Sequence, residues 1–289
     1  MSRRLPASRR TCAALTEHGE EWLLVDFDTP EALAEIVSDA LWSLGVVAIE
    51  EMESSEGRVL LRTSLGVDAS AGTAAIVDRF RGVTATPVSV PASVADTWRK
   101  FAVPTHVVDD VWIVPQWSPQ PIGRCILVEP FDTFGLGNHP TTVLTLRAAL
   151  SVASSGDLAL DLGSGSGVLS VALAKLADCE VDAHDIASQG EHALLHNAGL
   201  NGCSSLVRWL PSVDTSSAGH YRLVMANILA PVLRQLSGDI QAVTERGGTI
   251  VLSGIREEQV PGVVEHFGEC EVVAVDTLEG WAGVTLRRN

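Results

Sequence analysis

The sequence contains few cysteines and no cysteine motif. Five cysteines are scattered over 289 residues, and no C-x-x-C pair occurs among them. An odd, dispersed set is not typical of a disulfide framework, and without paired cysteines no metal site is indicated. The sequence therefore favours a reducing, cytoplasmic environment for the protein.

Long apolar stretches are also missing. No run approaches the roughly 20 residues that a membrane-spanning helix needs, so we expect no membrane association. The first twenty residues contain four arginines but no continuous apolar segment, so the sequence predicts no secretory signal. We expect residues 1–20 to form a disordered tail.

The sequence contains few basic residues compared with acidic ones. Lysine and arginine number 20 against 36 aspartate and glutamate residues, which gives a net charge of −16. Such a surface repels the nucleic-acid backbone, so we expect no direct nucleic-acid partner. The charge would attract a basic protein, although acidic surfaces also serve simply to keep proteins in solution.

What is present is a globular composition, with 46% hydrophobic and 19% charged residues in a chain long enough for two domains. From Trp22 the pattern alternates as in a strand, and Thr29-Pro30 is typical of a helix start. Strands are predicted next at 46–49 and 58–63, and a second helix at 71–80. This order predicts a small α+β, ferredoxin-like domain over residues 21–90.

The segment that follows has an unusual composition. Residues 81–95, with Pro87 and Pro91, are predicted to be a connector. Residues 96–121 hold three tryptophans and four prolines, which is too rigid and apolar for a flexible linker. We therefore expect residues 91–125 to form an interdomain linker that packs against one or both domains.

From residue 126 onward strand and helix patterns alternate. The predicted strands are 158–162, 180–185, 206–209, 222–228, 249–253, 271–276 and 284–287. Helix-length stretches separate the first five, as in βαβ units of a parallel sheet with helices on both faces. Residues 126–289 are therefore predicted to form a doubly wound α/β domain with a mostly parallel sheet.

A glycine loop ends the first of these strands. Residues 161–167 read D-L-G-S-G-S-G, and bare backbone there lets a ligand approach the free N–H groups of the next helix. Asp185 comes 22 residues after Gly163, where a carboxylate can accept hydrogen bonds from both hydroxyls of a ribose. Together these features predict a nucleoside-binding site.

The loop does not match the dinucleotide pattern. That pattern is G-x-G-x-x-G, and here Val168 stands where the third glycine would fall. Asp161 also precedes the glycines, which the dinucleotide pattern does not require. Because spacing alone is weak evidence, a nicotinamide dinucleotide and S-adenosylmethionine both remain open at this point.

Two further motifs accompany the loop. Residues 129–142 read E-P-F-D-T-F-G-L-G-N-H-P-T-T, and residues 224–233 read V-M-A-N-I-L-A-P-V-L. With the glycine loop, and in this order, they resemble the PrmA family of methyltransferases, which modify ribosomal protein L11. The resemblance covers nearly the whole chain, including W-R-K-F and W-I-V-P-Q-W in the predicted linker.

The resemblance implies a seven-stranded, Rossmann-like class I methyltransferase domain that binds S-adenosylmethionine. It implies protein N-methylation, at lysine side chains or the N-terminal amine of ribosomal protein L11, by an enzyme that we expect to be a monomer. The positions matching the family's cofactor site are Thr142, Asp161, Gly163, Gly165, Gly167, Asp185 and Asn227. As the catalytic residue, Asn227 would hold the attacking amine with its amide oxygen and aim the lone pair.

Three residues of the first motif are possible walls of the substrate pocket: Phe131, Phe134 and His139. Packing for the phenylalanines and helix capping for the histidine are the simpler roles. His192 and His196 lie four apart on a predicted helix, but no third ligand is evident and H-E-x-x-H is absent, so we expect no metal site.

Three positions depart from the family pattern. Leu136 replaces a threonine, Phe131 replaces a glycine, and Ala187 replaces a second acid near the ribose carboxylate. These departures leave open another protein lysine or a small amine as the acceptor. The alternatives of another class are a nicotinamide-dependent oxidoreductase and a cofactor-binding regulator without turnover.

Overall fold

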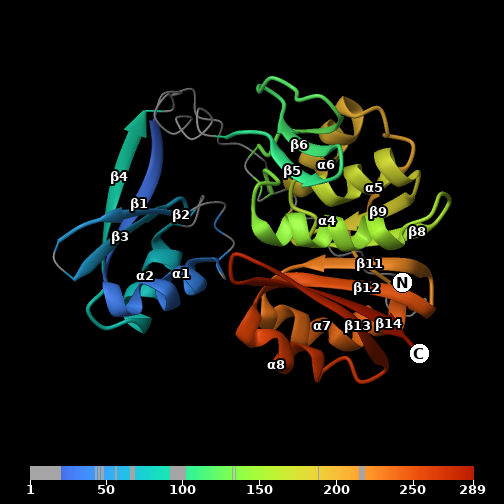
Figure 1. Cartoon of the computed structure of the whole chain (residues 1–289). Helices are drawn as coiled ribbons and strands as arrows, with labels where there is room; N and C mark the ends of the chain where they lie inside the picture. The colour runs from blue at the N-terminus through green and yellow to red at the C-terminus, as the bar shows by residue number, and fades with distance from the viewer. Residues whose placement is uncertain are drawn as a thin grey trace, which may run out of the picture. The chain divides into compact units, whose positions relative to one another are not determined.

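The computed structural model describes residues 21–91 and 102–289, with gaps at 43, 45, 47–48, 56, 66–68, 132, 134, 188 and 215–218. The described residues form two compact units, one within residues 21–91 and one within residues 102–289 (Figure 1). The predicted tail at 1–20 lies outside the described residues.

The N-terminal unit follows the order β-α-β-β-α-β. Its elements are β1 (Glu21–Pro30), a short 3-10 helix (Glu31–Leu33), α1 (Ala34–Trp42), β2 (Ile49–Glu53), β3 (Arg58–Thr63), α2 (Ala69–Arg79) and β4 (Thr84–Pro91). The four strands form an antiparallel sheet in the order β2-β3-β1-β4. Phe27, Leu41 and Leu61 are fully buried where the helices cover the sheet. The unit is therefore a small α+β structure.

Two expectations for this unit are wrong. The helical segment begins one residue later than predicted: Thr29 and Pro30 end β1, Pro30 rather than Thr29 is the N-cap of the 3-10 helix, and the Thr29 hydroxyl donates to the Phe27 carbonyl at 3.2 Å. The expected connector at 81–95 contains β4, which pairs with β1 along its whole length. Because β4 lies at the edge of the sheet, Pro87 and Pro91 are tolerated there without loss of interior hydrogen bonds.

The C-terminal unit begins with a three-stranded sheet made of β5 (Thr105–Val108), β6 (Val111–Pro115) and β7 (Arg124–Val128). Residues 102–125 therefore belong to this unit, in contrast to the linker expected over 91–125. The reason is burial: Val107, Ile113 and Ile126 are inaccessible to solvent and belong to the unit's main apolar cluster.

The seven predicted strands of the α/β region are confirmed. They are β8 (Leu158–Leu162), β9 (Glu180–His184), β10 (Val207–Trp209), β11 (Tyr221–Asn227), β12 (Thr244–Arg256), β13 (Cys270–Leu278) and β14 (Trp281–Arg288). The sheet order is β10-β9-β8-β11-β12-β14-β13, and all neighbours are parallel except those of β14. The order reverses between β8 and β11, which is where open α/β sheets bind their ligands.

Helices cover both faces of this sheet (Figure 1). One face carries α4 (Pro140–Val152), α5 (Val168–Ala177) and α6 (Gln189–Leu200), and the other carries α7 (Ala230–Val243) and α8 (Val260–Val264). Between β10 and β11 the described residues contain no helix, although a helix-length stretch was expected there.

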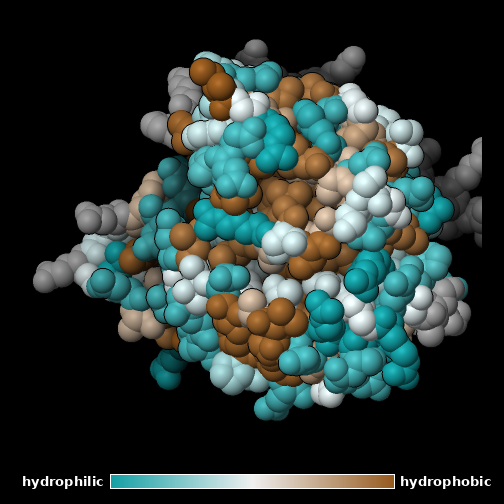
Figure 2. Space-filling model, turned by 45° about the vertical axis from the view of Figure 1, so that its right-hand side comes forward, coloured by the Kyte–Doolittle hydropathy of each residue, from teal (hydrophilic) through white to brown (hydrophobic). Residues whose placement is uncertain are grey.

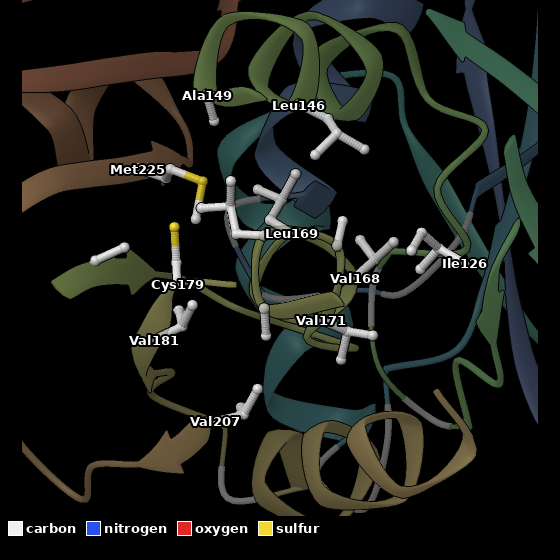
Figure 3. Packing of buried hydrophobic residues seen from close by; sticks show 14 of the residues in the cluster. Ile126, Leu146, Ala149, Val168, Leu169, Val171, Cys179, Val181, Val207 and Met225 are labelled. Atoms are coloured by element: carbon white, nitrogen blue, oxygen red, sulfur yellow. The ribbon is translucent and has the colours of Figure 1, made fainter. Parts of the chain in front are cut away.

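The two faces have separate apolar cores. Ala159 of β8 packs into the cluster on the α5 side, together with Val168, Leu169 and Met225 (Figure 3). Leu160, next along β8, packs into the cluster on the α7 side. Because successive side chains of a strand point to opposite faces, Asp161 faces α5, as Ala159 does.

On the face of the molecule that Figure 2 shows, hydrophilic areas alternate with apolar patches. Val272, Val273 and Val275 of the edge strand β13 are among the exposed apolar residues. Within the described part of the chain, none of the helices has the length and apolarity needed to cross a membrane.

Candidate functional site

The glycine loop lies at the carboxyl end of β8, where the sheet order reverses. Gly163, Gly165 and Gly167 have φ angles of 75°, 51° and 76°, a left-handed conformation that glycine adopts without strain. The Gly163 N–H donates to the His184 carbonyl at 2.8 Å, and α5 begins directly after Gly167. The three glycines are therefore required by the backbone conformation of the loop.

Two of these glycines also allow close packing. A Cβ on Gly163 would lie 2.3 Å from Cγ2 of Ile228, the residue after Asn227. A Cβ on Gly167 would lie 2.3 Å from the Leu194 side chain on α6. Gly163 thus brings the ends of β8 and β11 together, whereas Gly167 lets α6 approach the loop.

We expect Gly163→Ala to destabilise the protein by about 2–4 kcal/mol, because the strain of positive φ adds to overlap with Ile228. Gly156→Ala is the matched control, since Gly156 has φ of 84° and open space around the position of a Cβ. It should cost only about 1–2 kcal/mol. Urea unfolding of both variants measures the difference, and equal losses would contradict the contact with Ile228.

Asp161 is a fully buried carboxylate with one unpartnered oxygen. Its Oδ2 accepts hydrogen bonds from the Ser170 hydroxyl at 2.6 Å and the Ser170 N–H at 3.2 Å, whereas Oδ1 accepts none from the described residues. Burial raises the pKa of Asp161 to about 6, although the bonds from Ser170 oppose the rise. A buried carboxylate in this state is complementary to a cationic donor.

Asp185 follows β9 and is fixed by the backbone. Its Oδ2 accepts from the Gly165 N–H at 2.9 Å, and its Oδ1 accepts from the Ala187 N–H at 2.8 Å. Each carboxylate oxygen retains a further lone pair for a ligand. The adjacent Ile186 is 98% exposed, an apolar surface beside this carboxylate that the sequence analysis missed.

Four predicted residues line a single cavity between the glycine loop and the end of β11: Thr142, Gly163, Gly165 and Asn227. The remaining lining residues, which the sequence analysis did not select, are Gly135, Ser164, Val168 and Leu169. The cavity volume is about 20 Å³, which is room for about one water molecule. Asp161, Gly167 and Asp185, the other predicted cofactor residues, do not line this cavity.

Asn227 is the last residue of β11. The peptide that follows it is fixed by the neighbouring strand, β12. The Ile228 N–H donates to the Ser253 carbonyl at 3.1 Å, and the register of β12 against β14 shifts between Leu252 and Ile255. Gly254 lies in this irregular part with φ of 81°, and a Cβ there would lie 2.5 Å from the Ile228 carbonyl oxygen. Gly254 thus fixes the peptide that follows Asn227, and no sequence signal pointed to it.

Comparison with known proteins gives the family. The family model described as ribosomal protein L11 methyltransferase (PrmA) matches residues 92–289. This chain belongs to the PrmA family. Membership makes it a methyltransferase by class and favours methyl transfer over nicotinamide-dependent oxidation.

Relatives in the PrmA family align over much of the chain. The ribosomal protein L11 methyltransferase of Geobacter sulfurreducens is 30% identical over 300 residues, covering 93% of this chain and 98% of the relative. That of Campylobacter concisus is 36% identical over 189 residues, covering 65% and 68%. The crystal structure of ribosomal protein L11 methylase from Lactobacillus delbrueckii subsp. bulgaricus aligns with a TM-score of 0.59 at 27% identity, covering 65% of this chain and 99% of that one.

Two of the expected pocket-wall residues of this PrmA chain, Phe131 and His139, lie outside the lining of the cavity. Phe131 has φ of 49°, and its ring packs edge-on against His192 and His196 of α6, with centroids 4.6 and 4.9 Å away. The third, Phe134, is outside the described residues. Within the described part of the chain, no group of three His, Cys, Asp or Glu side chains is placed to hold a metal.

His139 begins α4 as its capping residue. Its Nδ1 lies 2.8 Å from the Thr141 hydroxyl and accepts from the Thr141 N–H at 3.3 Å, and its ring contacts Trp281 edge-on. Burial lowers the pKa of His139 to about 4, and the positive charge of Arg256 contributes to the lowering. The imidazole is therefore neutral at physiological pH, in a capping role.

Proposed function

We propose that this chain is an S-adenosylmethionine-dependent protein N-methyltransferase acting on amino groups of ribosomal protein L11, either lysine side chains or the N-terminal amine. The observation that carries the proposal is the convergence of Thr142, Gly163, Gly165 and Asn227 on one cavity. Together they come from all three family motifs. They meet where the sheet order reverses, as expected of a cofactor site.

The chemistry of the surrounding groups fits this cofactor. Asp161 offers a buried oxygen to an ammonium group, and the Ser164 hydroxyl is likewise buried without a partner among the described residues. Asp185 offers its carboxylate to ribose hydroxyls, beside the exposed apolar side chain of Ile186. When bound, S-adenosylmethionine supplies a methyl group on a cationic sulfonium, which is already activated for transfer.

The protein's own task is to align the acceptor and exclude water. In our proposal the Asn227 amide oxygen accepts a hydrogen bond from the incoming amine and directs its lone pair. The amine must arrive neutral, and desolvation lowers a lysine pKa from its reference value of about 10.4. For this reason no side chain is assigned as a dedicated base.

We assign the N-terminal unit to the ferredoxin-like type and propose that it recognises the protein substrate. Its strand order, β2-β3-β1-β4, and its β-α-β-β-α-β sequence of elements support the assignment. The net charge of −16 suits a basic ribosomal protein. The enzyme would act as a cytoplasmic monomer, without direct nucleic-acid or membrane partners.

Asn227→Ala should lower the rate of methyl transfer about 100-fold, because the amine is no longer aligned. Purified ribosomal protein L11 and methyl-labelled cofactor provide the assay, and Gln235→Ala, an exposed change on α7, is the control. Equal rates for the wild type and Asn227→Ala would contradict the role of Asn227. Failure of the wild type to label the protein would remove it as the acceptor.

A second acceptor remains the competing proposal. Leu136 and Phe131 depart from the family pattern in the motif that borders the cavity, which favours a changed acceptor rather than a changed reaction. Ala187 contacts the site through its backbone, because its N–H donates to Asp185. Labelling of another protein or a small amine in a cell extract, without labelling of ribosomal protein L11, would support this alternative.

A further inference from the structure

The second edge of β7 is completed by side chains instead of a strand. Among the described residues, β7 pairs with β6 on one side only. On its other side, Lys175 donates to the Cys125 carbonyl at 2.8 Å. The Asn201 side chain accepts from the Leu127 N–H at 2.9 Å and donates to the Leu127 carbonyl at 2.7 Å. Alternate residues of β7, Cys125 and Leu127, are thus hydrogen-bonded to α5 and to the turn that follows α6.

Asn197 of α6 bonds to Glu129, the next residue in the same alternating pattern, and also to the glycine loop. Its side chain accepts from the Glu129 N–H and donates to the Glu129 carbonyl, both at 2.9 Å. Its amide nitrogen also donates to the Ser166 carbonyl in the glycine loop, at 2.9 Å. Asn197 is fully buried, so both of its N–H donors are used inside the protein.

The two segments that Asn197 joins provide two of the walls of the cavity, and the end of β11 provides a third. Glu129 begins the segment 129–142, which contributes Gly135 and Thr142, and Ser166 belongs to the glycine loop. The walls meet again where the Ser166 hydroxyl donates to the Gly135 carbonyl at 2.5 Å. Asn197 therefore joins the walls at a second place, separate from this contact.

We propose that Asn197 is a positioning residue that holds the segment 129–142 in register with the glycine loop, so that cofactor affinity depends on it. The inference rests on the proposed cofactor. Removing the amide leaves two buried carbonyls without their donor, and the walls shift to recover partners. A shift of about 1 Å is enough to impair a preorganised site.

Asn201 provides a matched control on the turn that follows the same helix. It is also buried and also bonds to both backbone polar groups of a single residue, here Leu127 of β7, but within the described residues its hydrogen bonds reach neither segment that Asn197 joins. Asn197→Ala and Asn201→Ala should both lower the melting temperature. Calorimetric titration with S-adenosylhomocysteine should show binding at least tenfold weaker for Asn197→Ala and within twofold of the wild type for Asn201→Ala.

Asn197→Ser keeps one hydroxyl donor, on a shorter side chain, and serves as the milder variant if Asn197→Ala does not fold. It should weaken binding by at least threefold. Binding by the Asn197 variants within twofold of the wild type would overturn the inference, as would equal weakening by Asn201→Ala. Absence of binding by the wild type would instead refute the proposed cofactor, and the inference with it.

Discussion

Asp161→Asn is expected to weaken the binding of S-adenosylhomocysteine about 30-fold or more, while leaving the ligand-free protein at least as stable as the wild type at pH 7.5. The loss of affinity follows from removing the charge on a buried oxygen that has no partner within the described residues. A factor of 30 corresponds to about 2 kcal/mol. Calorimetry and urea unfolding measure the two effects.

The stability effect has a definite pH dependence. The pKa of Asp161 is about 6 in the folded state and 3.8 without the protein environment, so the folded state holds the proton more tightly. Stability contributed by this group is present below about pH 4 and is lost as the pH rises to about 6, by up to about 3 kcal/mol. An asparagine side chain cannot ionise, so the free energy of unfolding of the Asp161→Asn variant should lack this pH-dependent loss.

Ligand affinity should change in the opposite sense with pH. The ionised carboxylate is the form that accepts from an ammonium, so wild-type affinity should fall as the pH drops below about 6. The variant should bind weakly across this range. Asp239→Asn, an exposed change on α7, is the control for both effects. A clear loss of stability in Asp161→Asn at pH 7.5, or unchanged affinity, would contradict the interpretation.

Gly254→Ala should be among the most destabilising single substitutions in the C-terminal unit. A Cβ there would lie 2.5, 2.8 and 2.9 Å from the O, C and N atoms of Ile228, and the φ of 81° is unfavourable for alanine. Backbone cannot move aside as a side chain can, so we expect a loss of about 4–5 kcal/mol, measured by urea unfolding.

Two helical glycines provide the comparison for Gly254. Gly238 in α7 and Gly262 in α8 have open space around the position of a Cβ and no positive φ. Gly238→Ala and Gly262→Ala should be neutral or stabilising by up to about 1 kcal/mol, because alanine favours helix. A Gly254→Ala variant as stable as these two would show that the peptide after Asn227 does not need glycine beside it.

The sequence predicted most of the α/β region because its signals are local. Apolar runs of strand length alternate with helix-length stretches, and the glycine loop marks the end of β8 at a fixed distance from Asp185. β4 was missed because prolines normally exclude a strand, and only the strand order showed that it lies at an edge. Residues 102–125 were assigned to a linker because composition does not show what a segment packs against.

For the candidate site, too, some residues could be predicted from the sequence and others could not. The sequence by itself predicted the residues that we propose for the chemistry, including Asp161, Gly163, Asp185 and Asn227, because each lies in a short motif or at a fixed distance from one. Only the tertiary structure revealed the contacts of Asn197 and Gly254. Their importance comes from groups distant in sequence, Ser166 and Glu129 for Asn197 and Ile228 for Gly254. Contacts of this kind leave no local pattern, since they depend on where the fold brings two backbones together.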